Sequence, residues 1–178
     1  MSDTDHIPCV RHRRFTVCNA LDDFDDDELV QVCPRCNKFS VICCDHVDDD
    51  DEPDCHYYTI VYTDGSTLRN GRDQPSSGLG IALGPSSSDQ HSIPVTNDID
   101  PNGRRSNQRA ELLAAIQGVK LGDMNDDECP EKRYLVIATD SKYVVKGITS
   151  WFRDWKVSTK IPCTAVGNLS PTKLVAEK

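Results

Sequence analysis

Val61-Tyr62-Thr63-Asp64-Gly65-Ser66 is an apolar, β-branched run that ends on a carboxylate and a glycine. The run starts at Tyr58, and its composition predicts a β-strand with Asp64 projecting from the end. A second, almost continuously apolar run, Tyr134 to Ala138, leads into Ala138-Thr139-Asp140-Ser141. Such a run is typical of a parallel strand buried on both faces, so Asp140 is also expected at a strand end.

A helix is predicted between these two runs, over Asn107 to Leu121. Ser106 is expected to cap it, and Glu111 lies in its first turn. Its apolar stripe is expected to contain Leu112, Leu113, Ile116 and Val119. A strand, a helix and a strand in this order form a right-handed crossover, which places both strand-end aspartates at the same carboxyl edge of a sheet.

Three carboxylates are therefore expected at one edge: Asp64, Glu111 and Asp140. Three converging anions would repel one another unless divalent cations neutralised them. Oxygen ligands favour Mg²⁺ or Mn²⁺ over zinc.

Two further short runs, Gly78 to Leu83 and Ser92 to Thr96, are separated by turn signals and predict an antiparallel meander. The whole pattern indicates an α/β fold.

The chain resembles the type 1 ribonucleases H from about Tyr57 to Lys156. The blocks that carry the resemblance occur in order: Tyr62-Thr63-Asp64-Gly65-Ser66, Gly78-Leu79-Gly80, Ser106-Asn107-Gln108-Arg109-Ala110-Glu111-Leu112, Ala138-Thr139-Asp140-Ser141-Lys142-Tyr143-Val144 and Gly147-Ile148-Thr149-Ser150-Trp151. The resemblance implies a ribonuclease H-like fold, in which helices flank a mixed sheet with an antiparallel meander and parallel strands.

The same resemblance implies an endonuclease that hydrolyses the RNA strand of RNA–DNA hybrids. In that family two Mg²⁺ ions flank the scissile phosphate. Asp64 would bridge the ions, and Glu111 and Asp140 would complete the ligation. Asn70, Ser106, Asn107 and Gln108 match family positions that contact the hybrid, near the 2′-hydroxyl groups and a DNA-strand phosphate. The alternative for these four residues is ordinary capping and turn formation.

Residues 157–178 depart from the family pattern. The segment holds neither an aspartate nor a histidine, so it is not expected to supply the family's fourth metal-binding aspartate or its histidine loop. With Pro162 and Pro171 and little periodicity, it is not expected to form the missing parallel strand. The fold is then incomplete at this end, and Tyr134 to Ala138 would lie at an exposed edge. The alternative function is a catalytically inactive protein that binds hybrids or a protein partner.

Seven of the nine cysteines lie before residue 56. Cys33-Pro34-Arg35-Cys36 followed by Cys44 and His46 predicts a structural zinc site of the Cys₃His type, in which Cys43 competes with Cys44 for one ligand position. The alternative is a set of unpaired thiols in an acidic leader. The expected organisation is a Cys-rich module over 1–47, an acidic linker over 48–56, a partial ribonuclease H-like domain over 57–156 and a divergent tail.

The formal net charge of −9 is unevenly distributed. Residues 1–56 carry a net charge of −10 and residues 57–178 carry +1. The acidic first part is not expected to lie along a phosphate backbone; if it binds zinc, it is expected to be a protein-interaction module or a local staple. No apolar run approaches the roughly 20 residues needed to span a bilayer, and the first ten residues resemble neither a secretory nor a transit peptide. A nuclear or cytoplasmic location is expected.

Overall fold

The computed structural model describes residues 10–11, 14–17, 21, 23–42, 58–101, 103–123, 134–151 and 173–177. Its helical elements are α1 (Asp26–Leu29), the 3₁₀ turn η2 (Ser87–Asp89), α2 (Asn107–Asp123), α3 (Lys142–Lys146) and the π-helical turn η4 (Gly147–Trp151). Its strands are β1 (Val10–Arg11), β2 (Arg14–Phe15), β3 (Val30–Val32), β4 (Phe39–Val41), β5 (Tyr58–Leu68), β6 (Ser76–Ala82), β7 (Gln90–Pro94), β8 (Tyr134–Thr139) and β9 (Lys173–Glu177). None of the helices in these ranges is long and apolar enough to cross a bilayer.

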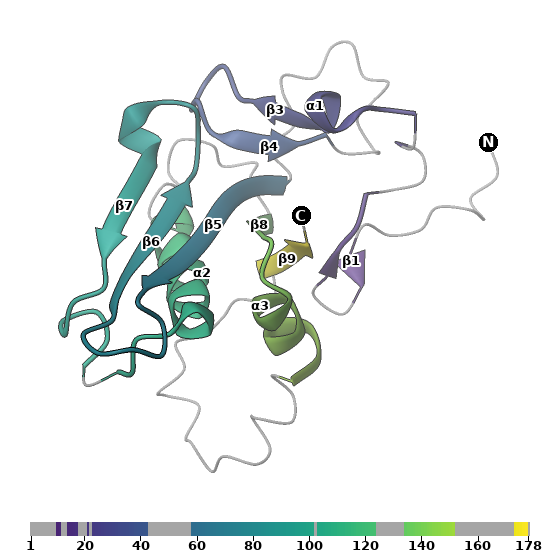
Figure 1. Cartoon of the computed structure of the whole chain (residues 1–178). Helices are drawn as coiled ribbons and strands as arrows, with labels where there is room; N and C mark the ends of the chain where they lie inside the picture. Colours follow the sequence, from purple (N-terminus) through teal and green to yellow (C-terminus); the bar gives the residue numbers. More distant parts are fainter. Residues whose placement is uncertain are drawn as a thin grey trace.

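The long strand β5 is the centre of a mixed sheet (Figure 1). β5, β6 and β7 form an antiparallel meander, which confirms the two short strands predicted after Asp64. β8 lies parallel to β5 on its other edge, as predicted from the apolar run at Tyr134. The α/β fold with both parallel and antiparallel strands is therefore confirmed.

Helix α2 packs against β5, β6 and β8 on one face of the sheet (Figure 1). Mainly small side chains face the sheet, because Ala110, Ala114 and Ala115 are buried. Leu112, Leu113 and Val119 pack at the margins of the core, whereas Ile116 is 50% exposed. The prediction of a stripe through Ile116 is therefore wrong, because Ile116 lies on the side of the helix away from the buried alanines.

The opposite face of the sheet carries a second core. Tyr58 and Ile60 of β5 and Val136 of β8 pack there against side chains from before residue 42. Residues of both strands alternate between the two cores, which explains why the sequence of β8 is apolar at successive positions.

Strand β9 corrects the prediction for the end of the chain. It pairs in parallel with β8 from Leu135 to Thr139, so β8 does not lie at an exposed edge. The strand begins two residues after Pro171, and its sequence has only three apolar residues in succession, without alternation. It ends at Glu177, whose backbone pairs with Thr139 at the carboxyl edge of the sheet.

Strands β3 and β4 continue the same sheet. β4 pairs antiparallel with Tyr58 and Thr59, on the edge of β5 that β6 occupies further along. The described part of the expected Cys-rich module thus shares its sheet with β5, although a linker had been expected to separate them. A three-residue strand such as β4 becomes stable through the longer strand it joins. The boundary at residues 48–56 lies outside the described residues.

Candidate active site

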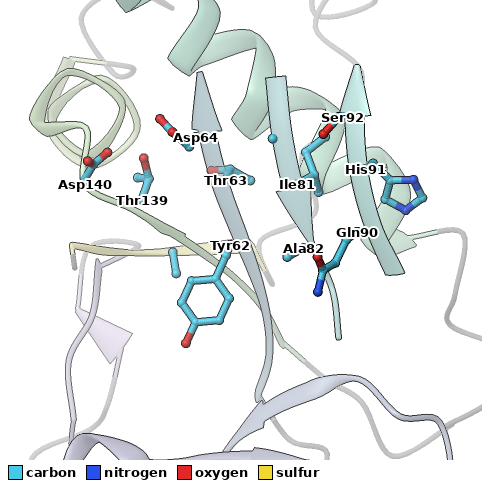
Figure 2. Close-up of a pocket in the computed structure, with 12 residues that line it drawn as sticks. Tyr62, Thr63, Asp64, Ile81, Ala82, Gln90, His91, Ser92, Thr139 and Asp140 are labelled. Carbon is cyan, nitrogen blue, oxygen red and sulfur yellow. The ribbon is translucent and has the colours of Figure 1, made fainter. Parts of the chain in front are cut away.

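Asp64 and Asp140 lie side by side at the carboxyl edge of the sheet. The parallel ladder pairs Tyr62 with Ala138, and each aspartate follows two residues later. Neighbouring strands are about 4.8 Å apart, so both carboxylates are within reach of one small ligand. Both residues are exposed, and Figure 2 shows the Asp64 side chain extending from β5 toward the side on which Asp140 lies. The predicted convergence of these two aspartates is confirmed.

A cavity of about 400 Å³ opens beside the two carboxylates. Its floor crosses β6, where Gly80 and Ala82 present almost no side chain, and its far wall is formed by β7 (Figure 2). The lining residues are Tyr62, Thr63, Asp64, Gly80, Ile81, Ala82, Gln90, His91, Ser92, Ala138, Thr139 and Asp140. The cavity therefore gives a ligand access to the carboxylates from the open face of the meander.

Glu111 lies just past the first turn of α2, not within it as predicted, and is connected to the same edge through Ser141. The Ser141 hydroxyl donates a hydrogen bond of 2.6 Å to Oε2 of Glu111 and accepts one of 3.3 Å from the backbone N–H of Val144. The backbone N–H of Ser141 donates to Oγ1 of Thr139 at 3.2 Å. Ser141 therefore caps α3 and at the same time holds the Glu111 carboxylate. Because Ser141 directly follows Asp140, this hydrogen bond connects Glu111 to the part of the edge that carries Asp140.

Gly65 allows α2 to approach the strand directly after Asp64. A Cβ atom at this position would lie 2.2 Å from the carbonyl carbon of Ala110 and 2.4 Å from the backbone nitrogen of Glu111. Side chains do not tolerate such distances, so only glycine lets the first turn of α2 touch β5 here. The glycine after Asp64 therefore brings Glu111 to the strand that carries Asp64.

The donor set fits a hard divalent cation. Asp64, Glu111 and Asp140 offer only carboxylate oxygens, the ligands that Mg²⁺ and Mn²⁺ prefer. Among the described residues, no three His, Cys, Asp or Glu side chains already lie close enough to enclose an ion. Asp64 and Asp140 lie at one sheet edge, and Glu111 is joined to that edge through Ser141.

Three of the other predicted contact residues lie at the start of α2, and Asn70 lies in the turn after β5. Ser106 accepts a hydrogen bond of 3.4 Å from the backbone N–H of Arg109, which confirms the predicted cap. Oδ1 of Asn107 accepts from the backbone N–H of Thr67 at 2.9 Å and ties the helix to β5. Gln108 is exposed, and so is Asn70 in the turn after β5. Contact between these four residues and a nucleic acid stays a prediction.

A buried carboxylate fixes the loop that leads into α2. Asp100 is only 4% exposed and accepts hydrogen bonds from Nε of Arg109 at 2.7 Å, Nη2 of Arg109 at 2.5 Å and Nη1 of Arg105 at 3.0 Å. The hydrogen bonds from Arg109 hold the pKa of Asp100 below its ordinary value, and the charges of Arg109 and Arg105 lower this pKa further, against the opposing effect of burial. The cluster holds Ser106 and Asn107 at the helix start.

The ribonuclease H family model matches residues 56–176, more than half of the chain. The chain belongs to the ribonuclease H family. The match extends past Lys156, where the recognisable motif blocks end, and includes most of β9. The resemblance inferred from the ordered motifs is thus confirmed.

Curated ribonucleases H are similar over the same region. Human "Ribonuclease H1" is 37% identical over 102 residues, which are 56% of this chain and 31% of the human protein. "Ribonuclease H" of Schizosaccharomyces pombe is 33% identical over 102 residues, or 57% of this chain and 33% of the yeast protein. The aligned region therefore spans about a third of each of these relatives. A solved foamy viral protease-reverse transcriptase in complex with dsDNA is 22% identical, with a TM-score of 0.49 over 71% of this chain and 84% of that chain.

The pH dependence of stability tests the buried carboxylate of this ribonuclease H domain. Since the pKa of Asp100 is lowered on folding, its stabilising contribution is complete above the ordinary value of 3.8 and is lost as the pH falls through the folded value. Asp100→Asn is expected to lower the free energy of unfolding by about 1–3 kcal/mol at pH 7. Urea denaturation from pH 7 to pH 2 should show this difference disappearing below about pH 4.

The matched control for this measurement is Asp98→Asn. Asp98 is exposed on the same loop, so its replacement should leave the stability within about 0.5 kcal/mol of the natural chain. If the difference in the free energy of unfolding between Asp100→Asn and the natural chain persisted unchanged at pH 2, the charge of Asp100 would not explain the effect.

Proposed function

We propose that this chain is a divalent-metal-dependent endonuclease that hydrolyses the RNA strand of RNA–DNA hybrids. The observation that carries the proposal is the position of three acidic family-motif residues at one sheet edge. Asp64 and Asp140 lie on neighbouring parallel strands, and Glu111 is held beside them by Ser141. Membership of the ribonuclease H family supports the hybrid as substrate.

The chain's own residues prepare this edge for a phosphodiester. Asp64, Glu111 and Asp140 would hold Mg²⁺ or Mn²⁺. When bound, such ions polarise phosphoryl oxygens and lower the pKa of a water molecule. Ser141 restricts the Glu111 carboxylate to one position, and Gly65 sets the separation between α2 and β5. The 400 Å³ cavity leaves room for a phosphate and part of its sugar.

Discrimination of RNA from DNA requires a contact to the 2′-hydroxyl. Asn107 and Gln108 begin the helix that carries Glu111, one turn before it, and are well placed to contact a hybrid whose phosphate lies at the carboxylates. Oδ1 of Asn107 is used by Thr67, which fixes the orientation of the amide and leaves its N–H groups as donors. Asn70 and Ser106 are proposed to contact the same hybrid.

A cleavage assay with several nucleic acids tests this function. End-labelled RNA would be offered to the full chain as an RNA–DNA hybrid, as double-stranded RNA and as a single strand, each with Mg²⁺, with Mn²⁺ and with chelator. We expect internal cuts in the hybrid RNA only, and only with a divalent ion. Binding of the hybrid without cleavage would favour the non-catalytic alternative, and cleavage in the presence of chelator would contradict metal dependence.

Ser141 offers a test of how Glu111 is positioned. Ser141→Ala and Ser141→Gly both remove the hydroxyl that bonds Glu111, and each is expected to reduce hybrid cleavage by about 10–100-fold. The two variants should differ in stability, because alanine at a helix cap costs about 1 kcal/mol and glycine only a few tenths. Cleavage rates and urea denaturation measured together separate these effects. Equal cleavage by Ser141→Gly and the natural chain would contradict the role assigned to the hydroxyl.

A further inference from the structure

The turn between β3 and β4 has the geometry of a thiolate-binding turn. The sulfur of Cys33 accepts hydrogen bonds from the backbone N–H groups of Arg35 at 3.2 Å and Cys36 at 3.3 Å. Cys33 is 1% exposed and Cys36 is half-buried. Asn37 then adopts the left-handed conformation, with a φ of 56°, and its N–H donates to the carbonyl of Cys33 at 2.8 Å.

The turn is wound around the Cys33 sulfur, because two backbone N–H groups are directed at it. Cysteine sulfur that ligates a soft divalent metal accepts hydrogen bonds of this kind from its surroundings. A spacing of two residues between cysteines, in a tight turn with proline after the first, allows both sulfurs to ligate one ion.

The turn is also held rigidly against the sheet that carries Asp64. Nδ2 of Asn37 donates to Oγ of Ser86 at 2.6 Å, and Lys38 forms an ion pair with the buried Asp89. The carbonyl of Asn37 lies so close to Gly84 that a Cβ there would be 2.2 Å away. A metal ligand attached to this turn is therefore preorganised, since little freedom remains to be lost on binding.

We propose that Cys33 and Cys36 are two ligands of a structural Zn²⁺ site. The ion would fix the β3–β4 hairpin, and through the pairing of β4 with Tyr58 and Thr59 it would stabilise the start of β5. Zinc in structural sites takes four ligands, so two more are required. Cys44 and His46, predicted from the sequence to complete the set, lie outside the described residues, and the proposal rests on the turn alone. It is independent of the proposed nuclease activity.

Metal analysis of the full chain, purified with reductant, tests the site. Zinc per chain would be measured by mass spectrometry, and Co²⁺ would replace zinc as a spectroscopic probe of thiolate ligation. We expect one zinc per chain and an intense sulfur-to-cobalt charge-transfer band. Cys33→Ser and Cys36→Ser should each weaken zinc binding by at least about 100-fold, whereas Cys163→Ser, far from the turn in sequence, should bind like the natural chain.

A ligand exchange covers the case in which the serine variants do not fold. Cys36→His keeps a zinc ligand at this position and removes one thiolate. It should retain the metal and lose part of the charge-transfer intensity, with an unchanged circular dichroism spectrum. Absence of zinc from the natural chain, or a Co²⁺ spectrum that Cys36→His leaves unchanged, would overturn the proposal.

Discussion

Asp64→Asn is expected to reduce cleavage of the RNA strand by at least about 100-fold, because even residues that only support metal ligands typically contribute 10–100-fold. Asparagine has the same shape as aspartate but no charge, and Mg²⁺ binds strongly only to anionic oxygens. The stability of the chain should not fall, because Asp64 is exposed and the substitution removes one of three like charges at the sheet edge. Cleavage rates and urea denaturation of the same preparations would be measured.

Metal binding gives this prediction a readout that does not depend on turnover. Calorimetric titration with Mn²⁺ in the absence of nucleic acid should show weaker binding to Asp64→Asn than to the natural chain. Asp98→Asn, which removes an exposed aspartate away from the site, should change neither cleavage nor metal binding. Retained cleavage in Asp64→Asn would contradict the proposed function, because Asp64 is one of the three carboxylates proposed to hold the metal ion.

The sequence alone was sufficient to predict the central strands and the position of the carboxylates at their ends. β5 and β8 are apolar at successive positions because both faces are buried, and such runs are visible without any partner. Asp64 and Asp140 interrupt these runs where the strands meet solvent, so their position at the edge follows from the connection alone. The cap at Ser106 was also visible, because a cap depends on neighbouring residues.

Features that depend on distant partners could not be predicted from the sequence. The β-strands β4 and β9 are three and five residues long, and each exists because a longer strand offers unpaired backbone groups beside it. The hydrogen bond from Ser141 to Glu111 joins residues thirty positions apart. One signal was missed. The small residues Ala110, Ala114 and Ala115 mark the face of α2 that packs closely on the sheet, and Ile116 does not lie on that face.

Gly65→Ala is expected to damage both stability and activity. The added Cβ would lie 2.2–2.4 Å from backbone atoms of Ala110 and Glu111, and backbone cannot rotate away as a flexible side chain can. Either β5 or the first turn of α2 must shift, at a cost of about 1–3 kcal/mol in the free energy of unfolding. The shift also moves Glu111 relative to Asp64, and a misplacement of about 1 Å can reduce a rate by 100-fold.

Gly78→Ala is the matched control, because Gly78 lies in the neighbouring strand β6 and a Cβ there would meet no atom within 4 Å. Alanine at that position should leave the free energy of unfolding within about 1 kcal/mol of the natural value, or raise it, since glycine weakens strands. Urea denaturation and hybrid cleavage would be compared for both variants. If Gly65→Ala lost stability but kept full cleavage, Glu111 would not need its position beside Asp64. If it lost cleavage while Ser141→Gly did not, the separation between α2 and β5, rather than the bond to Ser141, would set the geometry of the carboxylates.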